Sequence, residues 1–343
     1  MAAGSRSRTR PVKPRVFITQ PVHPAAIERL NSVADVEWNR DPLHIMTGGE
    51  LISAVRKADV LYCLLHDRVD REVIEANPKL LGIASTTITP ADIDIAAATA
   101  RRLPVTVIPA AMLDDATADL AWALMLCVAR RVAEADRLMR DGTFPGSQSA
   151  YIEGGGVSGR TLGLIGMGGV GRAAARRAAG FSMRVLYYDP RRLEGHEERA
   201  LGLTWQPLEV LLAESDFVSL HARLTPATRH LMGARELGLM KPSAYLVNTA
   251  RGPLVDEQAL VRALAAKRIA GAGLDVFEHE PRPDPALLAM PNVVVTPHAG
   301  SAVTALRARM AQVAVDNIIA MLEGRRPPNC WNPEIYEQAA SHG

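Results

Sequence analysis

Three charged side chains in the second half of the chain each follow a short apolar run. Arg251 lies in LVNTARGPLVDE, Glu280 in LDVFEHEP and His298 in VVVTPHAGS. If these runs are strands of one parallel sheet, the three residues meet at its carboxyl edge, where ligands of open α/β sheets bind. An arginine fork suits a carboxylate, and an imidazole beside a carboxylate is favoured in its protonated form, which can donate to a carbonyl oxygen. The residue types therefore predict acid–base chemistry on an anionic substrate.

A glycine-rich turn supplies a second candidate site. The stretch LIGMGGVGRA places Gly166, Gly168 and Gly171 in the pattern G-x-G-x-x-G between an apolar run and a run of helix-forming residues. The first glycine permits a tight turn, the second lets a pyrophosphate approach, and the third lets helix and strand pack closely. The N-terminus of the following helix attracts phosphate. The pattern alone is weak, because any turn from strand to helix can use glycines.

An acidic residue at the right distance strengthens this interpretation. Asp189 ends RVLYYD at 189 − 171 = 18 residues after the last glycine, near the spacing at which an acid accepts hydrogen bonds from the adenosine ribose. Its charge repels a 2′-phosphate, so we expect NAD to be preferred over NADP. Arg191 and Arg192 follow directly and could tolerate the phosphate, which keeps NADP possible.

The apolar runs alternate with helical segments along the chain, which predicts an α/β protein with parallel sheets. Five runs (RVFITQPV, VEWNR, DVLYCLL, LLGIAST and PVTVIP) precede one long predicted helix from about Thr117 to Gly142. Six further runs begin at Thr161 and fit a doubly wound sheet. We place the terminal helix, Val303 to Gly324, on the first domain. The expected architecture is two Rossmann-like domains, with a dinucleotide domain (113–302) inserted in a flavodoxin-like substrate domain (1–112 and 303–343).

Composition favours a small-molecule partner. The 343 residues are 48% hydrophobic and 22% charged, with a formal net charge of +2, which gives no electrostatic case for nucleic acid or a membrane surface. Cys63, Cys127 and Cys330 are far apart, so neither a disulfide framework nor a metal site is expected, and a reducing compartment, the cytoplasm, is favoured. The basic opening segment, residues 1–15, lacks the apolar core of a secretory signal; a disordered leader is expected, with a transit peptide as the alternative.

Four segments carry a family resemblance. TLGLIGMGGVGRAAARRAAGF, SLHARLTPATRHLMGARELGLMKPSAYLVNTARGPLVDEQAL, GAGLDVFEHEP and PNVVVTPHAGSA resemble the NAD-dependent D-2-hydroxyacid dehydrogenases, which include glyoxylate and hydroxypyruvate reductases. The resemblance implies that Arg251 anchors a 2-oxo acid, that His298 is the general acid and base, and that Glu280 keeps His298 protonated. It also implies a homodimer and four further cofactor-binding residues, namely Gly169, Val170, Thr249 and Asp275.

Two segments depart from the family pattern. The family's substrate loop contains Val-Gly, where this chain has Ile88 and Thr89 within STTITPAD, and Ala91 stands at an Asp position. Ile88 and Thr89 are therefore the expected substrate-binding pair, and either the loop is reshaped around Pro90 or the substrate differs. The threonine hydroxyls of this loop fit extra substrate hydroxyls, although local capping is the commoner role of threonine in loops. The sequence HAR, residues 221–223, replaces the family's His-x-Pro beside the nicotinamide.

Two other functions stay open at this point. Phosphite dehydrogenase keeps a similar arginine, glutamate and histidine set, and NAD-sensing transcriptional corepressors use the same fold as a binding module. Turnover of a 2-oxo acid distinguishes the reductase interpretation from both alternatives.

Overall fold

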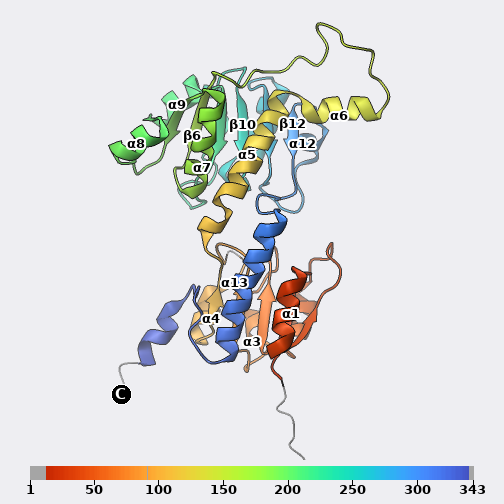
Figure 1. Ribbon diagram of the computed structural model, residues 1–343, viewed down its shortest axis with the longest axis vertical. Coiled ribbons are helices and arrows are strands. Elements are labelled where there is room, and N and C mark those ends of the chain that lie inside the picture. The colour runs from red at the N-terminus through yellow and green to blue at the C-terminus, as the bar shows by residue number, and fades with distance from the viewer. Residues whose placement is uncertain (1–12, 91, 340–343) are drawn as a thin grey trace, which may run out of the picture. The chain divides into compact units, whose positions relative to one another are not determined.

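The computed structural model describes residues 13–90 and 92–339. It divides into two compact units, one made of the described residues of Met1–Met112 and Val303–Gly343 and the other of Leu113–Ala302 (Figure 1). Most of the predicted basic leader, and Ala91 of the predicted substrate loop, lie outside the described residues. None of the helices in the described ranges is long and apolar enough to cross a membrane.

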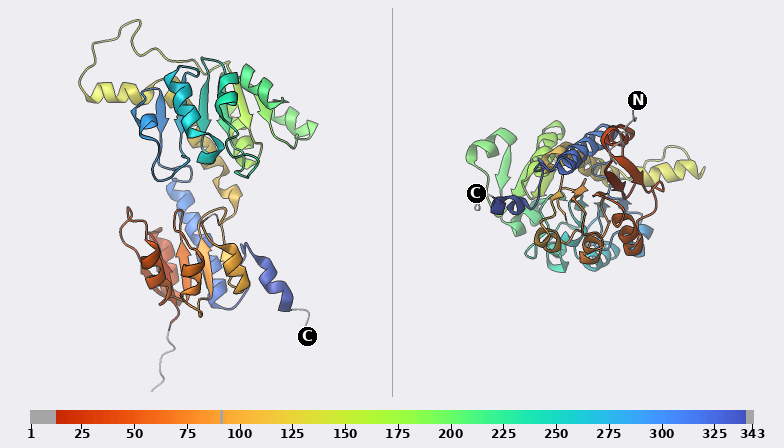
Figure 2. Two further views of the ribbon diagram at one scale, coloured as in Figure 1. Left: turned by 180° about the vertical axis from the view of Figure 1, so that it is seen from behind. Right: turned by 90° about the horizontal axis from the view of Figure 1, so that it is seen from below.

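The first unit contains a five-stranded parallel sheet in the order β2-β1-β3-β4-β5, the order of flavodoxin-like folds. Its strands are β1 (Arg15–Ile18), β2 (Asp35–Trp38), β3 (Val60–Cys63), β4 (Gly82–Ser85) and β5 (Val105–Thr106). Helices α1 (Pro24–Val33) and α13 (Thr304–Leu322) cover one face, and α2 (Gly48–Val55), α3 (Arg71–Glu75) and α4 (Ile95–Ala100) cover the other (Figure 2). Both faces are covered, so the inner strands β3 and β4 are buried along their whole length, whereas the edge strand β2 alternates polar and apolar residues.

The C-terminal part of the chain completes this unit. On α13, the side chains of Ala314, Val315 and Ile318 are fully buried against the sheet. Beyond α13, Cys330 pairs antiparallel with Thr106 of β5, and the buried Asn332 accepts a hydrogen bond from the Val105 amide (2.9 Å). This segment precedes the 3₁₀ helix η4 (Pro333–Ala339) and covers the edge of β5, which would otherwise be open to pairing with another chain.

The second unit contains a seven-stranded parallel sheet in the order β12-β11-β10-β9-β6-β7-β8. Its strands are β6 (Thr161–Ile165), β7 (Arg184–Tyr188), β8 (Leu203–Trp205), β9 (Phe217–Leu220), β10 (Tyr245–Asn248), β11 (Gly271–Leu274) and β12 (Val293–Val295). The predicted fold class is confirmed, but the prediction of six strands is wrong. The additional strand, β8, has three residues at the sheet edge and pairs with β7 alone among the described strands, so it has no long apolar run to mark it.

Helices cover both faces of the second sheet. Helices α5 (Asp114–Ala129) and α7 (Gly169–Ala178) lie on one face, followed by η2 (Ala179–Phe181) and the outlying α8 (Gly195–Leu201). The other face carries α9 (Leu208–Glu214), α10 (Ala234–Leu239), α11 (Glu257–Ala265) and α12 (Pro285–Ala289), seen in the left view of Figure 2. A short 3₁₀ helix, η3 (Gly252–Leu254), precedes α11, and another, η1 (Ala110–Leu113), precedes α5.

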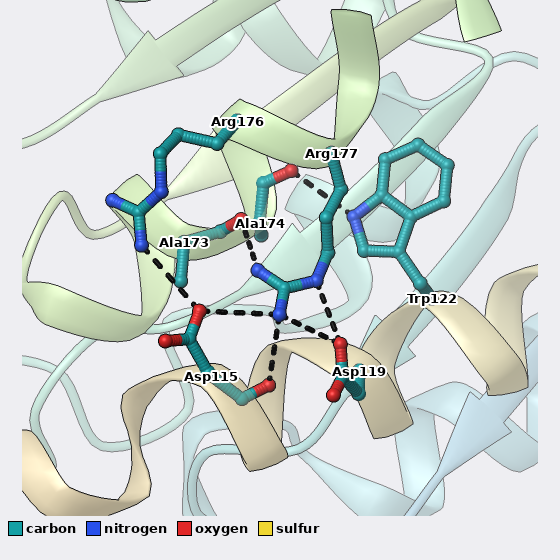
Figure 3. A network of polar contacts seen from close by, with 7 residues as sticks. All are labelled: Asp115, Asp119, Trp122, Ala173, Ala174, Arg176 and Arg177. Carbon is teal, nitrogen blue, oxygen red and sulfur yellow. Dashed lines mark hydrogen bonds and ion pairs between the residues drawn. The ribbon is translucent and has the colours of Figure 1, made fainter. Parts of the chain in front are cut away.

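Polar contacts fix α7 on α5 (Figure 3). Arg177 of α7 donates from Nε to Asp119 (2.8 Å) and from Nη2 to Asp115 (3.1 Å), while its Nη1 bonds the Ala173 carbonyl (2.7 Å). From α5, the indole of Trp122 donates to the Ala174 carbonyl (3.0 Å). Because α7 begins at the glycine-rich turn, these contacts also hold that turn in place.

The prediction of a single long helix from about Thr117 to Gly142 is wrong, because the helix is interrupted. The chain forms two helices, α5 and α6 (Val132–Arg140), separated at Arg131, whose φ of +53° lies in the left-handed region. The Gly155 amide bonds the last α5 carbonyl, that of Ala129 (2.8 Å), and a Cβ at Gly154 would collide with that same oxygen. A returning segment therefore ends α5, and α6 and the connection after it extend away from the sheet of their unit (Figure 1).

Candidate functional site

The glycine-rich turn follows β6 and shows why each glycine is needed. Gly166 has φ of +97°, and a Cβ there would lie 2.6 Å from the backbone nitrogen of Ala222. A Cβ at Gly171 would collide with the Gly166 carbonyl oxygen, so the absence of a side chain lets α7 begin close to the strand. A Cβ at Gly168, by contrast, would meet no described atom within 4 Å. The protein therefore leaves open space at the second glycine, where a phosphate would approach.

The N-terminus of α7 is available to an anion in the described structure. Gly168 is the N-cap residue and offers no side-chain cap, so the first amides of the helix, including those of Gly169 and Val170, have no side-chain acceptor from that residue. A Cβ at Gly169 would collide with the carboxylate of Asp114, which burial gives a raised pKa. The side chain of Asp114 thus occupies the space beside Gly169, the third of the four glycines in this turn, and would have to move to admit a side chain there.

Asp189 lies at the end of β7, directly against the glycine turn. Its Oδ2 accepts from the Met167 amide (2.9 Å) and its Oδ1 from the Arg191 amide (3.0 Å), which fixes the carboxylate beside the turn. Of the two arginines that follow, Arg192 is engaged, because its Nε bonds Glu198 at 2.8 Å and its guanidinium holds the pKa of Glu198 down at about 2. Arg191 is therefore the better placed of the two to contact a 2′-phosphate.

Two buried polar atoms at the carboxyl ends of neighbouring strands have no hydrogen-bond partner among the described residues. They are Oγ1 of Thr249, which follows β10, and Nδ1 of His221, which follows β9. The other ring nitrogen of His221 contacts Ser219 Oγ at 3.0 Å, and burial lowers the pKa of His221 to about 4. Buried polar atoms normally find partners, so these two fit a ligand with its own polar groups, as the amide and ribose of a dinucleotide provide.

The predicted acid and base form a direct pair. His298 Nδ1 lies 2.8 Å from Glu280 Oε2, and Glu280 Oε1 accepts from the Phe277 amide (3.0 Å). The side chains are 25% and 17% exposed, so the pair is shielded from bulk water and still reachable. The φ of His298 is +52°, an uncommon conformation for a residue with a side chain that must be held by the surrounding structure.

Arg251 lies on the loop between β10 and η3. Its Nη1 donates to the Ala250 carbonyl (2.6 Å), and burial lowers the pKa of its guanidinium, an effect that the Glu280 charge opposes. A Cβ at the next residue, Gly252, would collide with the Phe277 carbonyl. The loop that carries Arg251 therefore rests directly on the backbone that leads to Glu280, and the structure brings Arg251, Glu280 and His298 together in one unit.

Asp275, predicted to bind the cofactor, has several partners within the protein. Its Oδ1 accepts from Thr296 Oγ1 (2.6 Å) and the Ala299 amide (2.7 Å), and its Oδ2 accepts from the Gly300 amide (2.9 Å). Burial raises the pKa of this carboxyl, and the hydrogen bonds oppose that rise. Asp275 thus fastens the loop that carries His298, and its second oxygen keeps room for one further donor.

The predicted substrate pair, Ile88 and Thr89, lies in the other unit at the carboxyl end of β4. Both side chains are half-buried. The Thr87 hydroxyl contacts Ser85 Oγ (2.7 Å), so it caps its own loop, which is the commoner of the two roles considered for these threonines. A pocket with space for about one water-sized group lies beneath the loop and is lined in part by Thr89 and Asp67.

Reasoning from the sequence missed three residues that contact other parts of the site rather than a ligand. Asp114, Thr296 and Glu257 are of this kind, since each lies against the backbone or a partner of a predicted site residue. Their only signal is position: Asp114 is the first residue of the long helix α5, and the other two flank a predicted site residue within a few positions in the chain.

Comparison with known proteins shows what the chain is similar to. A family model described as "D-isomer specific 2-hydroxyacid dehydrogenase, NAD binding domain" matches residues 122–300. The glyoxylate reductase of Thermococcus litoralis is 44% identical over 328 residues, which cover 94% of this chain and 98% of that one. The crystal structure of the TT0316 protein from Thermus thermophilus has a TM-score of 0.85 at 43% identity, covering 92% of this chain and 99% of its own. The NADPH-dependent glyoxylate/hydroxypyruvate reductase of Sinorhizobium meliloti, solved with NADP and malonate, has a TM-score of 0.77 at 30% identity, covering 93% and 96%.

Replacing Gly168 by alanine tests whether a ligand uses the open space at the turn. Because the new methyl group meets no described atom within 4 Å, the unfolding free energy in urea should stay within about 0.5 kcal/mol of the wild-type value. The dissociation constant for NADH, measured by fluorescence titration, should rise at least about tenfold, because the methyl group takes the space of the pyrophosphate.

Gly180→Ala is the matched control, since that position is also open and should change neither quantity. Unchanged NADH binding by Gly168→Ala would contradict the assignment of the turn.

Proposed function

The chain belongs to the family of D-isomer specific 2-hydroxyacid dehydrogenases, and from this premise we propose that it is an NAD(H)-dependent reductase of the glyoxylate/hydroxypyruvate reductase kind. It interconverts a 2-oxo acid and a D-2-hydroxy acid by hydride transfer. The observation that carries the proposal is the 2.8 Å contact between His298 and Glu280, in the same compact unit as Arg251 and the glycine turn.

The three charged residues divide the chemistry among them. When bound, the reduced nicotinamide supplies a hydride to the carbonyl carbon of the substrate. His298 donates a proton through Nε2 to the carbonyl oxygen, where negative charge grows as the reaction proceeds. Glu280 holds the ring through Nδ1 (2.8 Å) and so fixes its orientation, with Nε2 left for the substrate. Arg251 binds the substrate carboxylate with its planar guanidinium.

The dinucleotide is held by residues around the glycine turn. The amides of Gly169 and Val170 would bind the pyrophosphate, and Asp189 would accept from the adenosine ribose. The unpartnered hydroxyl of Thr249 and one oxygen of Asp275 suit the nicotinamide end. In the other unit, Ile88 and Thr89 contribute to substrate binding at the carboxyl end of β4.

We also propose that the protein is a homodimer and works in the cytoplasm. Helix α6 has no buried residue, and Val132, Met139 and Phe144 on it and on the connection after it are 52%, 58% and 53% exposed. Such a run of exposed apolar side chains is typical of an interaction surface, and a second copy of the chain is the partner we assign to it. The cytoplasmic location rests on the three free cysteines.

Replacing His298 by alanine should lower kcat for 2-oxo acid reduction by roughly 10²- to 10⁴-fold, because the proton donor is lost. NADH binding should be unchanged, since the imidazole does not hold the dinucleotide. Glu280→Gln should also lower kcat, because the ring loses the carboxylate that holds it through Nδ1 at 2.8 Å. Arg251→Met should raise KM as well as lower kcat.

The control for the loss of a histidine is His196→Ala, an exposed residue of α8 that should keep full activity. Steady-state rates with glyoxylate, hydroxypyruvate, pyruvate and longer 2-oxo acids supply the measurement. Near-normal turnover by His298→Ala on the best substrate would refute the mechanism. Oxidation of phosphite with NAD would favour the phosphite dehydrogenase alternative, and tight NADH binding without turnover would favour the corepressor alternative.

Replacing Asp189 by alanine should narrow the preference for NAD over NADP. The carboxylate accepts from the ribose hydroxyls and opposes a 2′-phosphate, so its loss weakens NADH binding and removes the repulsion. Because Arg192 is engaged by Glu198 (2.8 Å), Arg192→Ala should affect NADPH use less than Arg191→Ala does. A wild-type enzyme with higher kcat/KM for NADPH than for NADH would overturn the assigned preference.

Light scattering at micromolar concentration should give the mass of a dimer. The double variant Met139→Glu and Phe144→Glu should be monomeric, because it replaces two exposed apolar side chains of α6 and the connection after it by charged ones. Leu43→Glu, at an apolar position that is 91% exposed in the other unit, is the control and should stay dimeric. A monomeric wild-type protein would count against the homodimer.

A further inference from the structure

The segment that carries Glu280 is tied at both of its ends to one side chain. Glu257, the first residue of α11, accepts from the Glu278 amide through Oε2 (2.8 Å) and from the Asp284 amide through Oε1 (2.8 Å). The side chain of Glu278 faces back toward the Glu257 amide (3.4 Å). Glu280 lies between the two anchored amides, so the length and path of its segment are set by a single carboxylate.

Glu257 is also linked to the loop that carries Arg251. That loop passes through η3 and Val255 into α11, and Gly252 within it lies so close to Phe277 that a Cβ would collide with the Phe277 carbonyl. Phe277 in turn donates its amide to Glu280 Oε1 (3.0 Å). The loops of Arg251 and Glu280 therefore touch at one point through backbone, and Glu257 fastens them at a second.

Burial of the Glu257 side chain costs free energy, which its hydrogen bonds to the backbone must offset. The residue is 7% exposed, and within the described ranges no cation forms an ion pair with its carboxylate. Burying an ionised carboxylate without a counter-charge is expensive, and here two backbone amides provide the compensation. A carboxylate satisfied in this way fixes two backbone points at once, which an apolar residue of the same size would not do.

We propose that Glu257 is a positioning residue. It holds Glu280 against His298 and at a fixed position relative to Arg251. It touches neither substrate nor cofactor and acts through the backbone of residues 278–284. The inference rests on the proposed function for the roles of those three residues. Glu257, on helix α11, would thus determine the geometry of the catalytic residues without itself taking part in the reaction.

The test is a double-mutant cycle between Glu257→Gln and Glu280→Gln. The amide of glutamine can accept from one backbone donor but places an NH₂ group against the other, so the segment should shift. Glu257→Gln alone should lower kcat roughly 10- to 100-fold, with the dissociation constant for NADH unchanged. In the Glu280→Gln background the same change should cost less than about twofold, because the interaction it supports is already gone. An equal loss in both backgrounds would show a general structural effect and overturn the proposal.

Two further variants separate position from stability. Asp216→Asn is the control: Asp216 also accepts from a backbone amide, that of Thr161 (2.9 Å), and pairs with Lys241 (2.9 Å), but it precedes the middle strand, β9, at the amino ends of the strands and away from the site. It should lower the melting temperature without changing kcat. If Glu257→Gln does not fold, Glu257→Asp keeps the charge and withdraws the carboxylate by one methylene, and it should lower kcat in the same direction. A variant at position 257 that folds and keeps kcat within twofold of wild type refutes the proposal.

A measurement without turnover keeps the proposal separate from the proposed function. A proton on His298 Nδ1 held by a carboxylate gives a downfield imidazole resonance in the NMR spectrum, which Glu280→Gln should abolish. Glu257→Gln should weaken or shift this resonance, whereas Asp216→Asn should leave it unchanged. If the wild-type protein reduced no 2-oxo acid, the proposed function would fail. The resonance would still decide whether Glu257 positions Glu280. An unchanged resonance in Glu257→Gln would overturn the proposal.

Discussion

The contact between His298 and Glu280 depends on loops that follow different strands, so it holds only if two stretches of irregular backbone are fixed to within a fraction of an ångström. The protein achieves this with carboxylates that accept backbone amides. Asp275 binds the amides of Ala299 and Gly300 on the histidine side. Glu257 has the corresponding contacts on the glutamate side. Loops are usually the most mobile part of a fold, and here two carboxylates hold these loops through four backbone amides.

The sheets below these loops impose their own constraint, because each is covered on both faces and must let helices approach closely. Glycines within strands meet this need. A Cβ at Gly273 of β11 would lie 2.9 Å from the Leu124 side chain of α5, and one at Gly163 of β6 would lie 2.6 Å from Leu211 of α9. Helix α5 in turn fixes α7 through contacts of Asp115 and Asp119 with Arg177, so the small residues in the strands help to place α7.

Much of this arrangement is readable in the sequence, for reasons that differ by element. The buried strands are continuous apolar runs, and the glycine turn and Asp189 keep a fixed spacing, so both were predictable. Strand β8 was missed because three edge residues make no run, and the break at Arg131 was missed because a distant segment, Gly154 and Gly155, causes it. The anchoring role of Asp275 could not be inferred, since sequence spacing does not show which backbone amides a side chain accepts.

The first unit is assembled from the two ends of the chain, and this has a consequence for its biosynthesis. Strands β1 to β5 leave the ribosome early, yet α13, which shares one face of their sheet with α1, and the segment that pairs with β5 belong to residues 304–332. The unit of residues 113–302 contains its whole sheet in one continuous stretch. It can therefore fold during translation while the first sheet has one face covered by α1 alone, and this incomplete unit is the stage at which a nascent chain of this design most needs a chaperone.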